Sequence, residues 1–202
     1  MRSVLDIDNR LKCKDEDLLD TPLVIVVNKF DETSVKTFQE DMDEAHRVGQ
    51  PVIPIVIDSY GGQVYSLMAM ITIIQASKIP VATICEGKAM SCGAILFSFG
   101  TEGHRYMSPH ATLMIHDVSH GSYGKVIETE ACSAQARRLN DTVYKMMAKN
   151  CGQPEQYFLD VVHAKGHADW YLDAKECKKH RLANHLRVPE LITEVKVAMR
   201  LV

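Results

Sequence analysis

The chain has 202 residues, of which 46% are hydrophobic and 24% charged, and its formal net charge is −3. The near-neutral charge and the 6% of aromatic residues give no support to nucleic-acid binding. No apolar run reaches the roughly 18 residues that a membrane-spanning helix needs, and residues 1–20 lack the apolar stretch of a signal peptide. We therefore expect one domain over residues 1–202, in the cytoplasm, with residues 1–20 as an N-terminal arm and with no nucleic-acid or membrane partner.

Strand and helix patterns alternate along the first half of the chain. The elements that we predict are strands at 22–28, 52–58 and 81–85 and helices at 31–48 and 63–77. Thr33 and Ser34 are the candidate caps of the first helix, and Gly49 is its expected end. Pro54 lacks a backbone N–H, which suggests that the second strand lies at an edge of the sheet or bends there.

The second half continues the alternation. We predict a strand at 112–116 and helices at 91–99, at 124–149 and directly after Pro154. The inner face of the long helix is expected to consist of Ile127, Ala131, Ala134, Leu139, Val143 and Met146. Asp173 and Glu176 have the spacing of a capping box. Alternating strands and helices indicate an α/β fold with a mostly parallel sheet.

Two turns lie where a strand leads into a helix, and both contain glycines. They cover residues 58–62 and 87–93, and they place backbone N–H groups at a helix start, where an anion is stabilised. Ser91 lies in the second turn, in the pattern A-x-S-x-G, which resembles a nucleophile elbow. A serine at this position is equally typical of a helix cap. His116 ends an apolar strand, where it is either a structural histidine or the base that a serine nucleophile requires.

The cysteines and histidines point to no metal centre. None of the six cysteines forms a C-x-x-C pair, so we expect free thiols. Two histidine pairs, His116 with His120 and His163 with His167, have a spacing of four residues and would share a face only if helical. The H-E-x-x-H motif is absent, and we expect neither a metal nor an organic cofactor.

Three motifs in fixed order carry a resemblance to a known family. They are D-S-Y-G-G at 58–62, G-K-A-M-S-C-G-A at 87–94 and M-I-H at 114–116. In sequence and ungapped spacing they resemble ClpP, the S14 peptidase of Clp ATP-dependent proteases, as a divergent or phage-encoded member. Residues 169–174 resemble the family's segment that contains its third catalytic residue. The resemblance extends over residues 22–186.

The resemblance implies a fold and an activity. The fold is the ClpP/crotonase-like α/β fold of repeated ββα units, with residues 124–149 as a long handle helix. The activity is that of a serine endopeptidase, which hydrolyses peptide bonds through an acyl-enzyme. Ser91 is then the nucleophile, His116 the general base and Asp169 the residue that orients the histidine.

The same resemblance implies the remaining site residues and the partners. The backbone N–H groups of Gly62 and Cys92 form the oxyanion hole, and Gly62, Gln63 and Val64 bind the substrate as an added strand. The expected substrates are peptides and unfolded proteins. The expected assembly is a homo-oligomer, a heptamer or a double heptamer, and a Clp-type AAA+ ATPase is a candidate partner.

Departures from the family pattern leave alternatives open. Asp117 replaces the usual glutamine after His116 and competes with Asp169 as the orienting acid. Cys92 replaces a methionine and is an alternative nucleophile. Residues 1–20 do not resemble the loops that engage the ATPase. This favours the alternative of a ClpP-like protease for phage head maturation, which acts without an ATPase. An inactive structural subunit of a ring is a further alternative.

Overall fold

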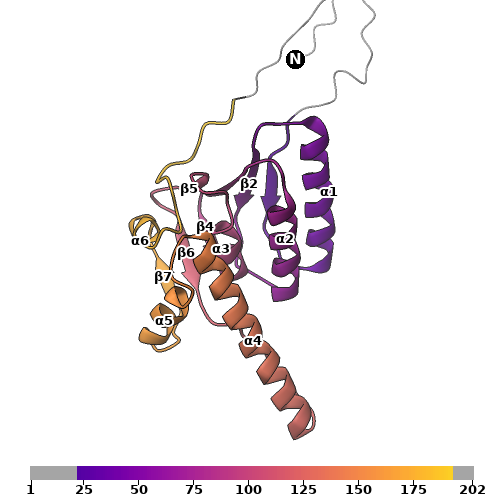
Figure 1. Ribbon diagram of the computed structural model, residues 1–202, viewed down its shortest axis with the longest axis vertical. Coiled ribbons are helices and arrows are strands. Elements are labelled where there is room, and N and C mark those ends of the chain that lie inside the picture. Colours follow the sequence, from indigo (N-terminus) through magenta and orange to yellow (C-terminus); the bar gives the residue numbers. More distant parts are fainter. Residues whose placement is uncertain (1–21, 193–202) are drawn as a thin grey trace, which may run out of the picture.

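The computed structural model describes residues 22–192, so the predicted arm at residues 1–20 lies outside the described part (Figure 1). A four-stranded sheet with the strand order β1-β2-β3-β5 forms its larger half, and all neighbouring strands are parallel. The strands are β1 (Ile25–Val27), β2 (Ile53–Ile57), β3 (Val81–Cys85) and β5 (Arg105–Met107). The alternating pattern thus predicted the parallel sheet correctly, apart from the short β5.

A smaller sheet has the strand order β4-β6-β7, in which β4 and β6 are parallel and β7 is antiparallel to β6. Its strands are β4 (Lys88–Met90), β6 (Thr112–Ile115) and β7 (Trp170–Leu172). The helices are α1 (Glu32–Val48), α2 (Val64–Ala76), α3 (Cys92–Phe97), α4 (Val126–Asn150), α5 (Tyr157–Ala164) and α6 (Ala174–Lys179). A mixed α/β architecture with one long projecting helix confirms the predicted fold class.

Helix α1 begins earlier than its predicted caps. Asp31 is the N-cap, and its carboxylate accepts the N–H of Ser34 at 2.7 Å. Ser34 Oγ in turn accepts the N–H of Asp31 at 2.9 Å, which completes a capping box. Thr33 and Ser34 are therefore inside the helix, and their prediction as caps is wrong. Gly49 ends the helix in the left-handed conformation, with φ of 70°, as predicted.

Pro54 does not lie in an edge strand, so the edge alternative of that prediction is wrong. Strand β2 is between β1 and β3, and Pro54 pairs with Ala82. The N–H groups of the neighbouring odd-numbered positions face β3, as the bond from Ile53 N–H to the Pro80 oxygen shows. The nitrogen of Pro54 therefore faces β1, where pairing begins only at Ile55. No ladder hydrogen bond is lost, so the sheet tolerates the proline.

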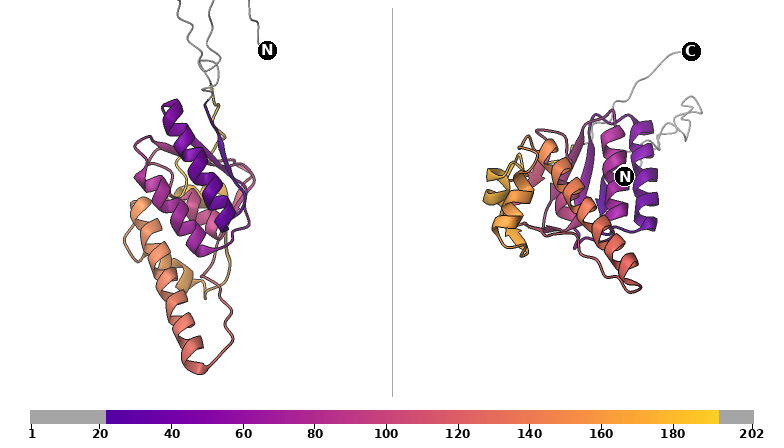
Figure 2. Two further views of the ribbon diagram at one scale, coloured as in Figure 1. Left: turned by 90° about the vertical axis from the view of Figure 1, so that its right-hand side faces the viewer. Right: turned by 60° about the horizontal axis from the view of Figure 1, so that its bottom comes forward.

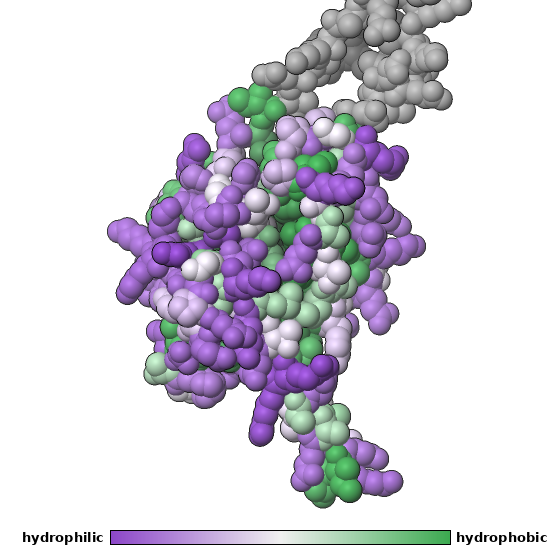
Figure 3. All heavy atoms as spheres, in the orientation of Figure 1, coloured by the Kyte–Doolittle hydropathy of each residue, from purple (hydrophilic) through white to green (hydrophobic). Residues whose placement is uncertain are grey.

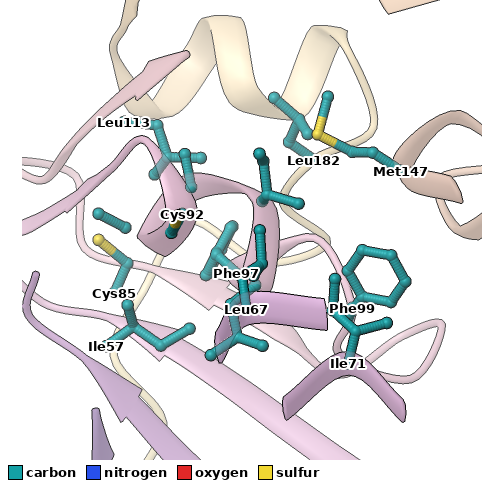
Figure 4. Packing of buried hydrophobic residues seen from close by; sticks show 14 of the residues in the cluster. Ile57, Leu67, Ile71, Cys85, Cys92, Phe97, Phe99, Leu113, Met147 and Leu182 are labelled. Atoms are coloured by element: carbon teal, nitrogen blue, oxygen red, sulfur yellow. The ribbon is translucent and has the colours of Figure 1, made fainter. Parts of the chain in front are cut away.

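Helix α3 joins the two sheets. All six of its residues are buried, and it packs against α2, β3, β4 and β6. Figure 4 shows Cys92 and Phe97 of this helix among core side chains that come from β2, β3, β6 and α2. The start of α3 is consequently fixed by the core.

Helix α4 has two different halves. Its second half is packed, with Leu139 and Val143 buried, whereas Ile127, Ala131 and Ala134 are exposed. The predicted inner face is therefore wrong for the first half, because that half projects beyond the body of the molecule (Figures 1 and 2).

An apolar tip marks the start of α4. It consists of the exposed side chains of Tyr123, Val126 and Ile127, and it is visible as a hydrophobic patch at the far end of the helix (Figure 3). Among residues 22–192, no helix has both the length and the apolar character required to span a membrane.

Candidate active site

Ser91 occupies the turn between β4 and α3 in a rare backbone conformation. Its φ is 54° and its ψ is −121°, a positive φ in a residue that carries a side chain. Such conformations cost about 1–3 kcal/mol and are concentrated at functional sites. The Ser91 N–H donates to the Met114 oxygen at 2.8 Å, which ties the turn to β6. Ser91 thus lies on a strained strand-to-helix turn, beside the strand that leads to His116.

Two glycines allow the turn at 58–62 to lie close to its neighbours in the structure. Gly61 has φ of 110°, and a Cβ at this position would lie 2.8 Å from the Cβ of Ser91. A Cβ at Gly62 would lie 2.6 Å from the backbone oxygen of Phe30. Both approaches exclude any side chain. Gly61 is therefore required for the turn at 58–62 to lie against the serine, and Gly62 is required for the same turn to lie against Phe30.

Two backbone N–H groups remain free beside Ser91. Within the described residues, the N–H groups of Gly62 and Cys92 donate no hydrogen bond. The Cys92 thiol donates to the Gly62 oxygen at 3.3 Å and so links the glycine turn to the start of α3. Burial raises the pKa of this thiol, which disfavours the thiolate that a cysteine nucleophile requires. The arrangement leaves two donors for an oxyanion and argues against Cys92 as the nucleophile.

A cavity of about 150 Å³ brings the predicted residues together. Its lining comprises Gly62, Gln63, Val64, Leu67, Ser91, Cys92, Ile95, His116, Val118 and Ser119. All the predicted site residues except Asp169 are in this set. A larger hollow of about 440 Å³ between α4 and α6 contains Lys178 and Arg181, but these cations bind backbone oxygens of Asn184 and Gly152. The smaller cavity is thus the one with the chemistry of a reaction site.

Asp169 directly precedes strand β7 and does not line the cavity. Strand β7 pairs with β6 so that Leu172 is opposite Leu113 and Trp170 is opposite Ile115. Continued by one residue, this register sets Asp169 opposite His116, where Cα atoms of antiparallel strands are about 4.5–5.5 Å apart. His116 is partly buried and Asp169 is exposed. No hydrogen bond joins Ser91, His116 and Asp169 within residues 22–192, and such bonds often tighten only when substrate binds.

Asp117 has other partners. Its Oδ1 accepts the side-chain amide of Asn140 at 3.0 Å, and its Oδ2 is 2.5 Å from Nδ1 of His167. Asp117 is thus bound by Asn140 and His167, and no hydrogen bond joins it to His116 within the described residues. His167 and Asn140 were not predicted as site residues, because no motif marks them and their contact with Asp117 spans 50 and 23 positions.

Neither histidine pair has helical geometry. His116 and His120 follow β6, and α5 ends at Ala164, before His167. The rings of His163 and His167 do lie together, with centroids 4.6 Å apart. Within the described residues, no group of three or more histidine, cysteine, aspartate or glutamate side chains is arranged to hold a metal ion.

The site and the fold agree with one protein family. A family model described as Clp protease matches residues 12–189, and the chain therefore belongs to the Clp protease family. The predicted membership and the ClpP fold are thereby confirmed. Membership of this family supports the prediction that the protein is a hydrolase of the serine peptidase type.

Proposed function

We propose that this protein is a serine endopeptidase that cleaves peptides and unfolded proteins with Ser91, His116 and Asp169. The observation that carries the proposal is the cavity that Ser91 and His116 share with the free N–H groups of Gly62 and Cys92. A serine, a base and two donors around one hollow are the groups that acyl transfer requires.

The proposed reaction has two stages. Ser91 Oγ attacks the carbonyl carbon of the peptide while His116 takes its proton, and His116 then protonates the leaving amine. Water next attacks the acyl-enzyme, again with His116 as base, and releases the acid and the free serine. The oxyanion of each tetrahedral intermediate accepts hydrogen bonds from Gly62 and Cys92. Loss of one such donor typically slows a reaction by about 100–1000-fold.

Asp169 is the proposed orienting acid. It accepts the second ring N–H of His116 and stabilises the imidazolium that forms. The register of β6 and β7 supports this role, since its continuation by one residue beyond Ile115 and Trp170 would set His116 and Asp169 opposite each other. Asp117 is the weaker candidate, because both of its oxygens already have partners.

Substrate is proposed to bind in extended form along residues 62–64. Gln63 is extended, Gly62 has φ of 155°, and the Gln63 N–H is already bound to the Phe30 oxygen at 2.8 Å. The substrate backbone therefore has the outer side of this short segment for pairing. Recognition through backbone atoms accepts many sequences, which suits unfolded chains as substrates.

We also propose a ring-shaped homo-oligomer, a heptamer or a double heptamer, served by a Clp-type ATPase. The exposed apolar tip of α4 supports contact with another copy of the chain, as does the unpacked first half of that helix. The family is generally oligomeric and paired with an ATPase. Sedimentation of the purified protein, with and without a Clp ATPase, measures both properties.

Replacement of the nucleophile tests the activity. Ser91→Ala should abolish hydrolysis of short peptides and of casein, because the proposed reaction passes through an acyl group on the Ser91 oxygen. The matched control is Ser122→Ala, which removes an exposed hydroxyl and should leave the rate unchanged. Hydrolysis retained by the Ser91 variant would overturn the proposal.

A further inference from the structure

The contact between Asp117 and His167 connects the two loops that carry the base and the acid. Asp117 follows His116 at the end of β6, and His167 precedes Asp169 at the start of β7. The bond from His167 Nδ1 to Asp117 Oδ2 therefore crosses from one loop to the other at 2.5 Å. It lies directly beyond the point at which the paired ladder of β6 and β7 ends, at Ile115 and Trp170. Past that point, no backbone hydrogen bond within residues 22–192 holds the two loops together.

The Asp117 side of this contact is fixed to the body of the molecule. Asn140 of α4 donates to Asp117 through Nδ2 at 3.0 Å and accepts the N–H of Val118 through Oδ1 at 2.9 Å. Asn140 thus holds both residues that follow His116. Two bonds from one amide side chain fix the loop to the packed half of α4.

The His167 side is held in an uncommon conformation. His167 has φ of 61° and follows Gly166, which has φ of 68°. A left-handed conformation is uncommon for residues other than glycine. The His167 side chain is half exposed, so its position depends on the bond to Asp117 more than on packing.

We propose that Asp117, Asn140 and His167, the loop clasp, act as positioning residues that hold Asp169 opposite His116. The inference rests on the proposed function, since it assigns the clasp to the orientation of the catalytic histidine. Without the clasp, the two loops are joined only up to Ile115 and Trp170, and Asp169 moves relative to the imidazole. Misplacement of a catalytic group by about 1 Å costs up to about 100-fold in rate.

The clasp is tested from both ends. His167→Ala and Asp117→Ala should each lower kcat by about 10–100-fold with little change in KM, because the substrate segment at 62–64 is untouched. The double variant should be no slower than Asp117→Ala alone, since Asp117→Ala already removes the contact with His167. His167→Asn should recover most of the rate, because its amide donates to Asp117 and asparagine tolerates the left-handed conformation. The matched control His163→Ala removes the neighbouring ring, which makes no bond to Asp117, and should stay near the original rate.

A readout independent of catalysis separates this inference from the proposed function. Histidine side-chain ¹⁵N chemical shifts report which ring nitrogen of His116 carries the proton. Asp169→Asn should change the His116 tautomer population, His167→Ala should change it in the same direction, and His163→Ala should not. If Ser91→Ala leaves hydrolysis intact, the proposed function fails whatever the spectra show. If the spectrum of His116 and kcat are both unchanged in His167→Ala, the clasp is overturned while the peptidase stands.

Discussion

The two halves of the candidate site are held by different forces. Around Ser91, positions are set by backbone sterics and the core: Gly61 is pressed against the serine, and Cys92 is 5% exposed. Around His116, the positions depend on polar contacts near the surface, and Asp169 and His167 are exposed. A close-packed site loses function when volume is added, whereas a surface-held site loses it when a polar partner or a charge is removed.

Apart from loss of the nucleophile itself, the largest expected effect is in the surface-held half. Asp169→Asn should reduce kcat by about 10⁴-fold, because an amide cannot stabilise the imidazolium or select the correct tautomer of His116. Thermal unfolding should be almost unchanged, since the side chain is exposed. The measurement is steady-state peptide hydrolysis, with Asp173→Asn as a nearby variant that alters a helix cap instead. A near-normal rate for Asp169→Asn would transfer the orienting role to Asp117.

In the close-packed half, an added methyl group should be enough to impair activity. Gly61→Ala places a Cβ 2.8 Å from that of Ser91 at a φ of 110°, so the turn must move away from the serine. We expect at least about a 100-fold loss of kcat/KM, together with a loss of stability of about 1–3 kcal/mol. Gly121→Ala is the matched control, because nothing lies within 4 Å of its added Cβ. Equal activity of the two variants would show that the contact with Ser91 has no importance.

The smallest effect concerns pH and again belongs to the surface-held half. Burial lowers the pKa of His180, whose Nδ1 is 2.8 Å from the Tyr157 hydroxyl and whose ring meets Trp170 of β7 edge-on. The unfolded chain therefore binds a proton at this residue more readily than the folded chain. The stabilising contribution is complete above the ordinary pKa of about 6.5 and is lost as the pH falls toward the lowered value.

Thermal unfolding at pH 7.5 and 5.5 tests this sign. His180→Asn should reduce the fall in Tm between the two pH values, because the titrating group is gone. His110→Gln, which replaces an exposed histidine, should preserve the full fall. An unchanged pH dependence in His180→Asn would show that His180 does not contribute to the pH dependence of stability.

Prediction from sequence succeeded where a signal is local. The motifs at 58–62, 87–94 and 114–116 identified the residues that line one cavity, and five-residue strands such as β2 and β3 were found from their β-branched runs. Strands β4, β5 and β7 were missed because each has only three residues and none of these residues is β-branched, whereas the equally short β1 consists of β-branched residues alone. Local pattern therefore located the chemistry better than it located the sheet edges.

The failures share a physical cause, which is that tertiary context is absent from local pattern. The period along α4 is the same in both halves, but only one half has a body to pack against. Pro54 was misassigned because the sequence does not say which neighbour its nitrogen faces. His167 was considered only as a metal ligand, because its bond to Asp117 depends on the pairing of two distant strands.

One measurement tests the central claim most directly: identification by mass spectrometry of the residue that a fluorophosphonate modifies. We predict a single adduct on Ser91 that is absent in Ser91→Ala and that forms more slowly in His116→Gln, because His116 takes the serine proton. Asp169→Asn should slow it as well, and Ser122→Ala should not. An adduct on another residue, or none on the intact folded protein, would contradict the assignment of Ser91 as the nucleophile.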